Sequence, residues 1–166
     1  MTGSSAPPRR AESKIGPLDV VMARLEEARA AGKTVALANG CFDVLHVGHV
    51  RYLRGAKAEA DVLVVGVNGD ASVRRLKGAG RPVLGEADRA LLVAAQRAVD
   101  HVVVFQDDDV KGLLLALRPD VHCKGTDYTP DTVPEREVVR SYGGRVAIVG
   151  DPKDHDTRKL IARIRG

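Results

Sequence analysis

The sequence predicts an α/β fold, with a doubly wound parallel sheet of five strands and helices on both faces. Short apolar runs alternate along the chain with segments whose apolar residues follow helical spacing, which is the pattern of parallel strands joined by helices. One of these runs, residues 62–67, has no polar alternation, as is typical of a strand covered on both faces. The 166 residues are 44% hydrophobic, which is enough for one domain with its own core.

The first half of the chain contains two predicted helices and two predicted strands. Apolar residues recur on one helical face from Leu18 onwards, and Gly32 ends that helix. A strand follows at residues 34–38, a helix at about 49–59, and then the apolar strand 62–67.

The second half continues the same alternation and completes the sheet. Its helices are predicted at residues 86–98, 110–117, 135–142 and 157–165, and its strands at 102–105, 121–123 and 145–149. The result is a Rossmann-like arrangement, in which ligands bind beyond the carboxyl ends of the strands. Polar residues that directly follow a strand are therefore the candidates for a functional site.

The N-terminal segment and the composition of the chain indicate the kind of cellular compartment in which we expect the protein. Residues 1–17 lack apolar periodicity and predict a flexible N-terminal tail, which leaves one domain over residues 18–166. No run approaches the roughly 18 apolar residues of a membrane span, and the N-terminus does not resemble a signal peptide. Cys41 and Cys123 are too few and too far apart for a disulfide framework or a metal motif. We therefore expect a cytoplasmic protein without a membrane partner.

The charge of the chain is basic but diffuse. The net charge is +4, only 3% of the residues are aromatic, and the Lys and Arg residues are spread over the whole length. A nucleic-acid surface would combine clustered basic and aromatic residues, so we expect no nucleic-acid partner. A basic balance also suits an enzyme whose ligands all carry phosphate.

The most informative segment is residues 39–49, where a predicted strand ends and a helix begins. A Gly-Cys-Phe-Asp turn is followed by His46 and His49, which flank Gly48. Free backbone N–H groups at a helix start form an anion site, and a glycine lets phosphate approach the backbone closely. The segment predicts a nucleoside triphosphate site, whereas a lone histidine here would more often be a helix cap.

These residues resemble the signature of the cytidylyltransferase-like nucleotidyltransferases, which move a nucleoside monophosphate from a triphosphate onto a phosphorylated acceptor. The resemblance implies that the two histidines bind and activate the triphosphate, and that a magnesium ion bridges its phosphates. It also implies catalytic roles for two residues of a basic segment that closes over phosphates, unless that segment is an ordinary exposed loop. The implied catalytic residues are His46, His49, Lys77 and Arg81.

Further binding residues follow from the same resemblance. Some of them bind the acceptor and lie at or just after the ends of strands. For Asn68 and Asp70, ordinary turn and helix-cap chemistry is an equally good explanation. The implied acceptor-binding residues are Asp43, Asn68 and Asp70. The implied nucleotide-binding residues are Gly40, Cys41, Phe42, His46, Gly48, His49, Lys124, Asp127, Thr157 and Arg158.

The start of the last helix departs from the family pattern. Related enzymes carry a run of Ser and Thr whose hydroxyls hold the outer phosphates, whereas this chain has Asp156, Thr157 and Arg158. Asp156 is a good helix cap, and Arg158 can offer a fork to phosphate. The departure leaves open a non-catalytic nucleotide-binding domain.

Within the family, the resemblance extends from about residue 15 to residue 166 and is strongest for adenylyltransferases that act on D-glycero-D-manno-heptose 1-phosphate. It rests on Val-Asn-Gly-Asp at 67–70, Lys-Gly-Ala-Gly-Arg-Pro-Val at 77–83 and Lys-Gly-Thr-Asp-Tyr at 124–128. It implies an enzyme that makes ADP-heptose from ATP, works as a homodimer, and stands alone without the sugar kinase to which many relatives are fused. The alternatives are a CTP-dependent cytidylyltransferase for glycerol 3-phosphate or a similar alcohol phosphate and, more remotely, an adenylyltransferase for FMN.

Overall fold

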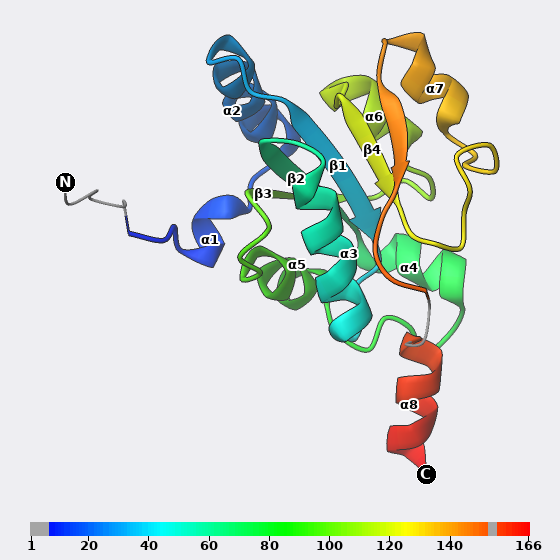
Figure 1. Ribbon diagram of the computed structural model, residues 1–166. Coiled ribbons are helices and arrows are strands. Elements are labelled where there is room, and N and C mark those ends of the chain that lie inside the picture. Colours follow the sequence, from blue (N-terminus) through cyan, green and yellow to red (C-terminus); the bar gives the residue numbers. More distant parts are fainter. Residues whose placement is uncertain (1–6, 153–155) are drawn as a thin grey trace.

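The computed structural model describes residues 7–152 and 156–166, and their core is a five-stranded parallel sheet (Figure 1). The strands are β1 (Val35–Gly40), β2 (Val62–Asn68), β3 (His101–Phe105), β4 (Val121–Lys124) and β5 (Arg145–Ile148). They lie in the order β3-β2-β1-β4-β5, and every pairing is parallel. The predicted doubly wound sheet is confirmed.

Helices cover both faces of the sheet and make two separate cores. One face packs against α3 (Val47–Ala58) and α5 (Glu86–Ala94), and the other against α2 (Leu18–Ala30), α6 (Lys111–Leu117) and α7 (Arg136–Ser141). Consecutive residues of β1 divide between the cores, because side chains alternate along a strand. Ala36 and Ala38 face α3 and α5, whereas Val35 and Leu37 face the other layer.

The strand order places a switch point beside β1. The chain runs outward from β1 through β2 to β3 and then returns to β4 on the opposite side of β1. The connections after β1 and β4 therefore leave toward opposite faces of the sheet. Such a switch point opens a crevice at the carboxyl ends of the strands.

The predicted flexible tail is partly ordered. Residues 1–6 lie outside the described part, but α1 (Ala11–Lys14) is a short helix, and Ile15 bridges to Val102 at the edge of the sheet. Ala11 and Ile15 pack against the core formed with α3 and α5. Their apolar side chains order a segment that shows no periodicity because it is only one turn long.

Two further helices border the carboxyl edge of the sheet. The segment predicted as a basic loop begins instead as a helix, since α4 spans Asp70–Lys77 and only the residues after it form a loop. The last helix, α8 (Thr157–Arg165), starts where the sequence predicts, and the Asp156 carboxylate caps it by accepting from the Arg158 N–H at 2.8 Å. Figure 1 shows α8 extending away from the sheet. None of the helices in the described ranges has the length and apolar content that spanning a membrane requires.

Candidate active site

The turn after β1 is a tight and partly strained piece of backbone. Phe42 is buried with φ at 49°, a left-handed conformation that bulky residues rarely adopt. A Cβ on Gly40 would lie 3.2 Å from the Phe42 ring, so the glycine permits the close packing of the turn. The buried phenylalanine therefore anchors the turn that carries the backbone amides of Cys41 and Phe42.

The two histidines at the start of α3 form a reciprocal cap. The Nδ1 of His46 accepts from the Gly48 N–H at 3.1 Å, and the Nδ1 of His49 accepts from the His46 N–H at 3.2 Å. The rings stack with their centroids 3.9 Å apart. A neutral imidazole whose Nδ1 accepts must carry its proton on Nε2. Both rings are thus held as Nε2–H donors.

The loop after α4 is tied to the turn through a buried carboxylate. Asp43 is 1% exposed and accepts from the backbone N–H groups of Val83 and Leu84 at 2.8 and 3.0 Å. It also pairs with Arg81, whose Nε lies 2.5 Å from Oδ2. Burial alone would raise the pKa of Asp43, but these hydrogen bonds and the Arg81 charge lower it. The carboxylate therefore holds the loop and Arg81 in place beside the cavity.

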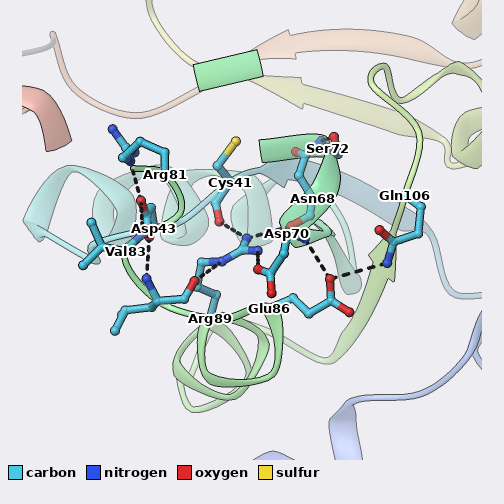
Figure 2. A network of polar contacts seen from close by, with 11 residues as sticks. Cys41, Asp43, Asn68, Asp70, Ser72, Arg81, Val83, Glu86, Arg89 and Gln106 are labelled. Carbon is cyan, nitrogen blue, oxygen red and sulfur yellow. Dashed lines mark hydrogen bonds and ion pairs between the residues drawn. The ribbon is translucent and has the colours of Figure 1, made fainter. Parts of the chain in front are cut away.

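A fully buried arginine joins the ends of β1 and β2, and sequence reasoning missed it. The Nη1 of Arg89 donates to the carbonyls of Cys41 and Asn68 at 2.6 and 2.7 Å, and its Nε donates to Leu84 at 2.9 Å. Its Nη2 lies 2.8 Å from the Asp70 carboxylate, and Figure 2 shows the guanidinium at the centre of this network. An arginine on the apolar stripe of a predicted helix is the signal that would have found it.

The β2 end contributes less to the cavity than the sequence suggests. Asp70 is taken up by Arg89 and does not line the cavity. Asn68 does line it, while its amide nitrogen donates to the Ser72 hydroxyl at 3.1 Å. Of this predicted pair, the structure brings only Asn68 to the site.

The β4 end presents a charged pair and an aromatic ring. The Nζ of Lys124 lies 3.9 Å from a carboxylate oxygen of Glu135 and 4.7 Å from the centre of the Tyr128 ring. Burial lowers the pKa of Lys124, and the charges of Glu135 and Asp127 partly restore it. The Tyr52 hydroxyl donates to the Cys123 carbonyl at 2.7 Å and so connects α3 to β4. Sequence reasoning did not identify Glu135 or Tyr52.

These elements surround one cavity of about 720 Å³ at the carboxyl edge of the sheet, which is in the size range of small-molecule sites. Apart from Asp70, every catalytic or binding residue expected from the sequence lines it. The members are Gly40, Cys41, Phe42, Asp43, His46, Gly48, His49, Asn68, Lys77, Arg81, Lys124, Asp127, Thr157 and Arg158. The fold thus joins five segments that lie far apart in the chain.

Comparison with known proteins identifies relatives of this chain. It is 50% identical over 154 residues to the bifunctional protein HldE of Geotalea uraniireducens and 48% identical over 153 residues to that of Pelobacter propionicus. These alignments cover 93% and 92% of this chain but 31% of each relative. The chain therefore spans about a third of the length of these relatives.

Solved structures agree on the fold. A lipopolysaccharide core biosynthesis protein from Thermoplasma volcanium superposes with a TM-score of 0.64 and 26% identity, covering 74% of this chain and all of that one. A pantoate-beta-alanine ligase from Francisella tularensis, complexed with beta-gamma ATP and beta-alanine, has a TM-score of 0.58 at 13% identity and covers 86% of this chain and 68% of that one. The family model described as Cytidylyltransferase-like matches residues 37–161. The chain belongs to the cytidylyltransferase-like family, as its signature predicted.

Proposed function

We propose that this protein is an adenylyltransferase that transfers AMP from ATP to D-glycero-D-manno-heptose 1-phosphate, giving ADP-heptose and pyrophosphate. The observation that carries this proposal is the pair of Nε2–H donors on His46 and His49 beside the turn after β1. Lys77, Lys124 and Arg158 add positive charge around the same cavity. The heptose is supported by the sequence segments shared with heptose adenylyltransferases and by the identity with HldE proteins.

The reaction needs alignment and charge stabilisation more than proton transfer. The second pKa of a phosphate monoester is about 6, so the acceptor is largely ionised at neutral pH and needs no general base. Its oxygen attacks the α-phosphorus, and the bond from that phosphorus to the bridging oxygen of the β-phosphate breaks. The electron pair leaves with pyrophosphate, and preorganised donors stabilise the charge that develops on it. His46 and His49 supply such donors without carrying a net charge.

The donor set of the site suits a magnesium ion bound through the nucleotide. Within residues 7–152 and 156–166 no three His, Cys, Asp or Glu side chains gather as a metal cage. The carboxylates nearest the turn already have protein partners, since Asp43 holds Arg81 and Asp70 holds Arg89. When bound, the ion would neutralise charge on the phosphates. The chain's own part is to hold the phosphates with amides, imidazoles and cations.

We further propose a cytoplasmic homodimer. Cys41 and Cys123 are free thiols, which suits a reducing compartment. Leu91 and Leu92 on α5 are 38% and 42% exposed and provide apolar surface for a second copy. Light scattering on the purified chain tests the assembly, because a mass of one chain would contradict the dimer.

The substrate pair is tested by measuring pyrophosphate release in the presence of magnesium. ATP and CTP are each combined with heptose 1-phosphate, glycerol 3-phosphate and FMN. Rapid release with ATP and heptose 1-phosphate alone is the expected outcome. Preference for CTP with an alcohol phosphate would replace the proposal with the cytidylyltransferase alternative. Nucleotide binding without release in any combination would favour a non-catalytic domain.

The role of His49 is tested by His49→Ala. The variant loses one preorganised donor, which costs on the order of 100-fold in turnover. Val47→Ala is the matched control, because Val47 lies between the two histidines, is 42% exposed and does not line the cavity. Unchanged turnover in a folded His49→Ala protein would contradict a catalytic role of His49.

A further inference from the structure

A second group of polar side chains lines the cavity on the face of the sheet covered by α6 and α7. Val35 and Leu37 of β1 face that layer, so Asn39, two residues further, lies on the same face. In β4, Val121 and Cys123 face the opposite layer, which puts His122 and Lys124 on the α6 and α7 face. Glu135 directly precedes α7 and completes the group.

Glu135 has an unsatisfied oxygen in this group. The residue is 7% exposed and lines the cavity, and its Oε2 is buried without a hydrogen-bond partner among the residues the structure describes. The Nζ of Lys124 lies 3.9 Å from that oxygen, beyond hydrogen-bond range. Buried carboxylate oxygens are normally hydrogen-bonded, because a buried acceptor without a hydrogen bond costs free energy. Because Glu135 lines the cavity, a rotation of its carboxylate that brings this buried oxygen to the cavity surface allows a ligand to supply the missing donor.

Asn39 is oriented by a buried histidine. The Nε2 of His122 lies 3.1 Å from the Oδ1 of Asn39, and an amide oxygen can only accept. His122 is fully buried, and burial lowers its pKa to about 3, so the neutral ring donates from Nε2. The N–H₂ group of the Asn39 amide therefore points away from His122. Since Asn39 lines the cavity, this group is a candidate donor to a ligand.

We propose that Glu135, Asn39 and Lys124 form a subsite for a vicinal diol of a sugar. Each hydroxyl of a diol both donates and accepts, and the subsite offers one carboxylate acceptor and two nitrogen donors. The acceptor sugar and the ribose of the nucleotide both carry this group. The inference rests on the proposed function and deepens it, since it says which residues select a polyhydroxylated substrate.

The test compares Glu135→Gln with Glu137→Gln in the full chain. Glu137 is the matched control, because it lies two residues after Glu135, its side chain is 72% exposed, and it does not line the cavity. Calorimetric titration measures the affinity of each protein for ATP and for heptose 1-phosphate, and needs no turnover. Losing a hydrogen bond to a charged group weakens binding by about tenfold or more. We expect that loss for one of the two ligands in Glu135→Gln alone.

Deoxy ligands identify which diol is bound, and their binding to the wild-type protein does not depend on the folding of a variant. If the subsite binds the acceptor, the wild-type protein discriminates against heptose 1-phosphate analogues that lack one ring hydroxyl, and Glu135→Gln loses that discrimination. If it binds ribose, the same pattern holds for 2′-deoxy-ATP and 3′-deoxy-ATP. Equal affinities of the two glutamine variants for both ligands would overturn the subsite while leaving the proposed function intact. A wild-type protein that binds neither ATP nor heptose 1-phosphate would instead overturn the proposed function and the subsite with it.

Discussion

The two walls of the cavity differ in how completely their polar groups are satisfied. On the β2 side, Arg89 and Asp43 are buried, and every hydrogen bond that they make runs to the protein. On the β4 side, the Oε2 of Glu135 and the Nδ1 of His122 are buried without hydrogen-bond partners in the described ranges. The buried polar groups of the first wall are bonded to the protein, whereas the second wall leaves an unsatisfied oxygen on Glu135, which lines the cavity; His122 is buried and does not line the cavity.

The difference separates positioning from recognition. A satisfied buried network is rigid and specifies one arrangement, which is what the turn before His46 and His49 needs in order to present its donors. A wall with unsatisfied polar groups gains hydrogen bonds when a ligand binds. Substitutions on the β2 side should therefore change stability first, and substitutions on the β4 side should change affinity and pH dependence first.

The largest effect on this comparison is expected from Arg89→Met. The change leaves the Asp70 carboxylate and the carbonyls of Cys41 and Asn68 without their donor. Because Asp70 is 39% exposed and can be solvated, the loss comes mainly from the buried carbonyls, and each one left without a donor lowers the free energy of unfolding by about 1–3 kcal/mol. Urea denaturation measures the sum. Arg54→Met, at an exposed position of α3, is the control. Similar stability for the two variants would contradict a structural role of the arginine.

Asp43→Asn should have the next largest effect. At neutral pH the loss of a charged hydrogen-bond acceptor lowers the free energy of unfolding by about 2 kcal/mol. Because the folded-state pKa of Asp43 lies below the ordinary 3.8, its stabilisation is fully present above that value and is lost as the pH falls through the lowered pKa. Denaturation at neutral and acid pH should show the gap to wild type closing in acid. A gap independent of pH would refute the assignment.

A smaller effect is expected from Tyr52→Phe, which removes a link between the two walls. The Tyr52 hydroxyl donates to the Cys123 carbonyl at 2.7 Å, and one such bond contributes about 1 kcal/mol. Thermal unfolding measures the loss. If the link also aligns the walls, kcat falls while the KM values stay close to wild type, and an unchanged kcat would limit the residue to stability.

The smallest expected effect is a displaced pH profile. Burial holds the pKa of Lys124 below the ordinary 10.5, so its positive charge is lost at a lower pH than that of an exposed lysine. The value of kcat/KM for ATP should therefore decline on the alkaline side before pH 10.5 is reached. In Glu135→Gln the decline should begin at a still lower pH, because the Glu135 charge raises this pKa. Profiles that coincide for the two proteins would count against the pairing.

The comparison also explains which parts of the site were predictable from sequence. The segment around His46 and His49 was recognisable because glycines, histidines and a helix start act over a few residues. Asp156 was recognised as a cap for the same reason, and the structure confirms it. The helix α1 was missed because a single turn carries little periodicity, and the helical start of the basic segment was missed because its basic residues and the glycines that follow resemble an exposed loop.

The sequence by itself determined the order of the five strands and of the six predicted helices, the apolar cores and the family, since these follow from periodicity and from contiguous motifs. Only the tertiary structure decided how the polar residues are paired. Asp70 reads as an acceptor-binding residue at a strand end, yet it is taken by Arg89, which is 19 positions away. Glu135 is only the first residue of a predicted helix in the sequence, yet it is buried with an oxygen 3.9 Å from the Lys124 Nζ. The physical reason is that the energy of a buried charge depends on its partners in space, and distant segments provide those partners only once the sheet has formed.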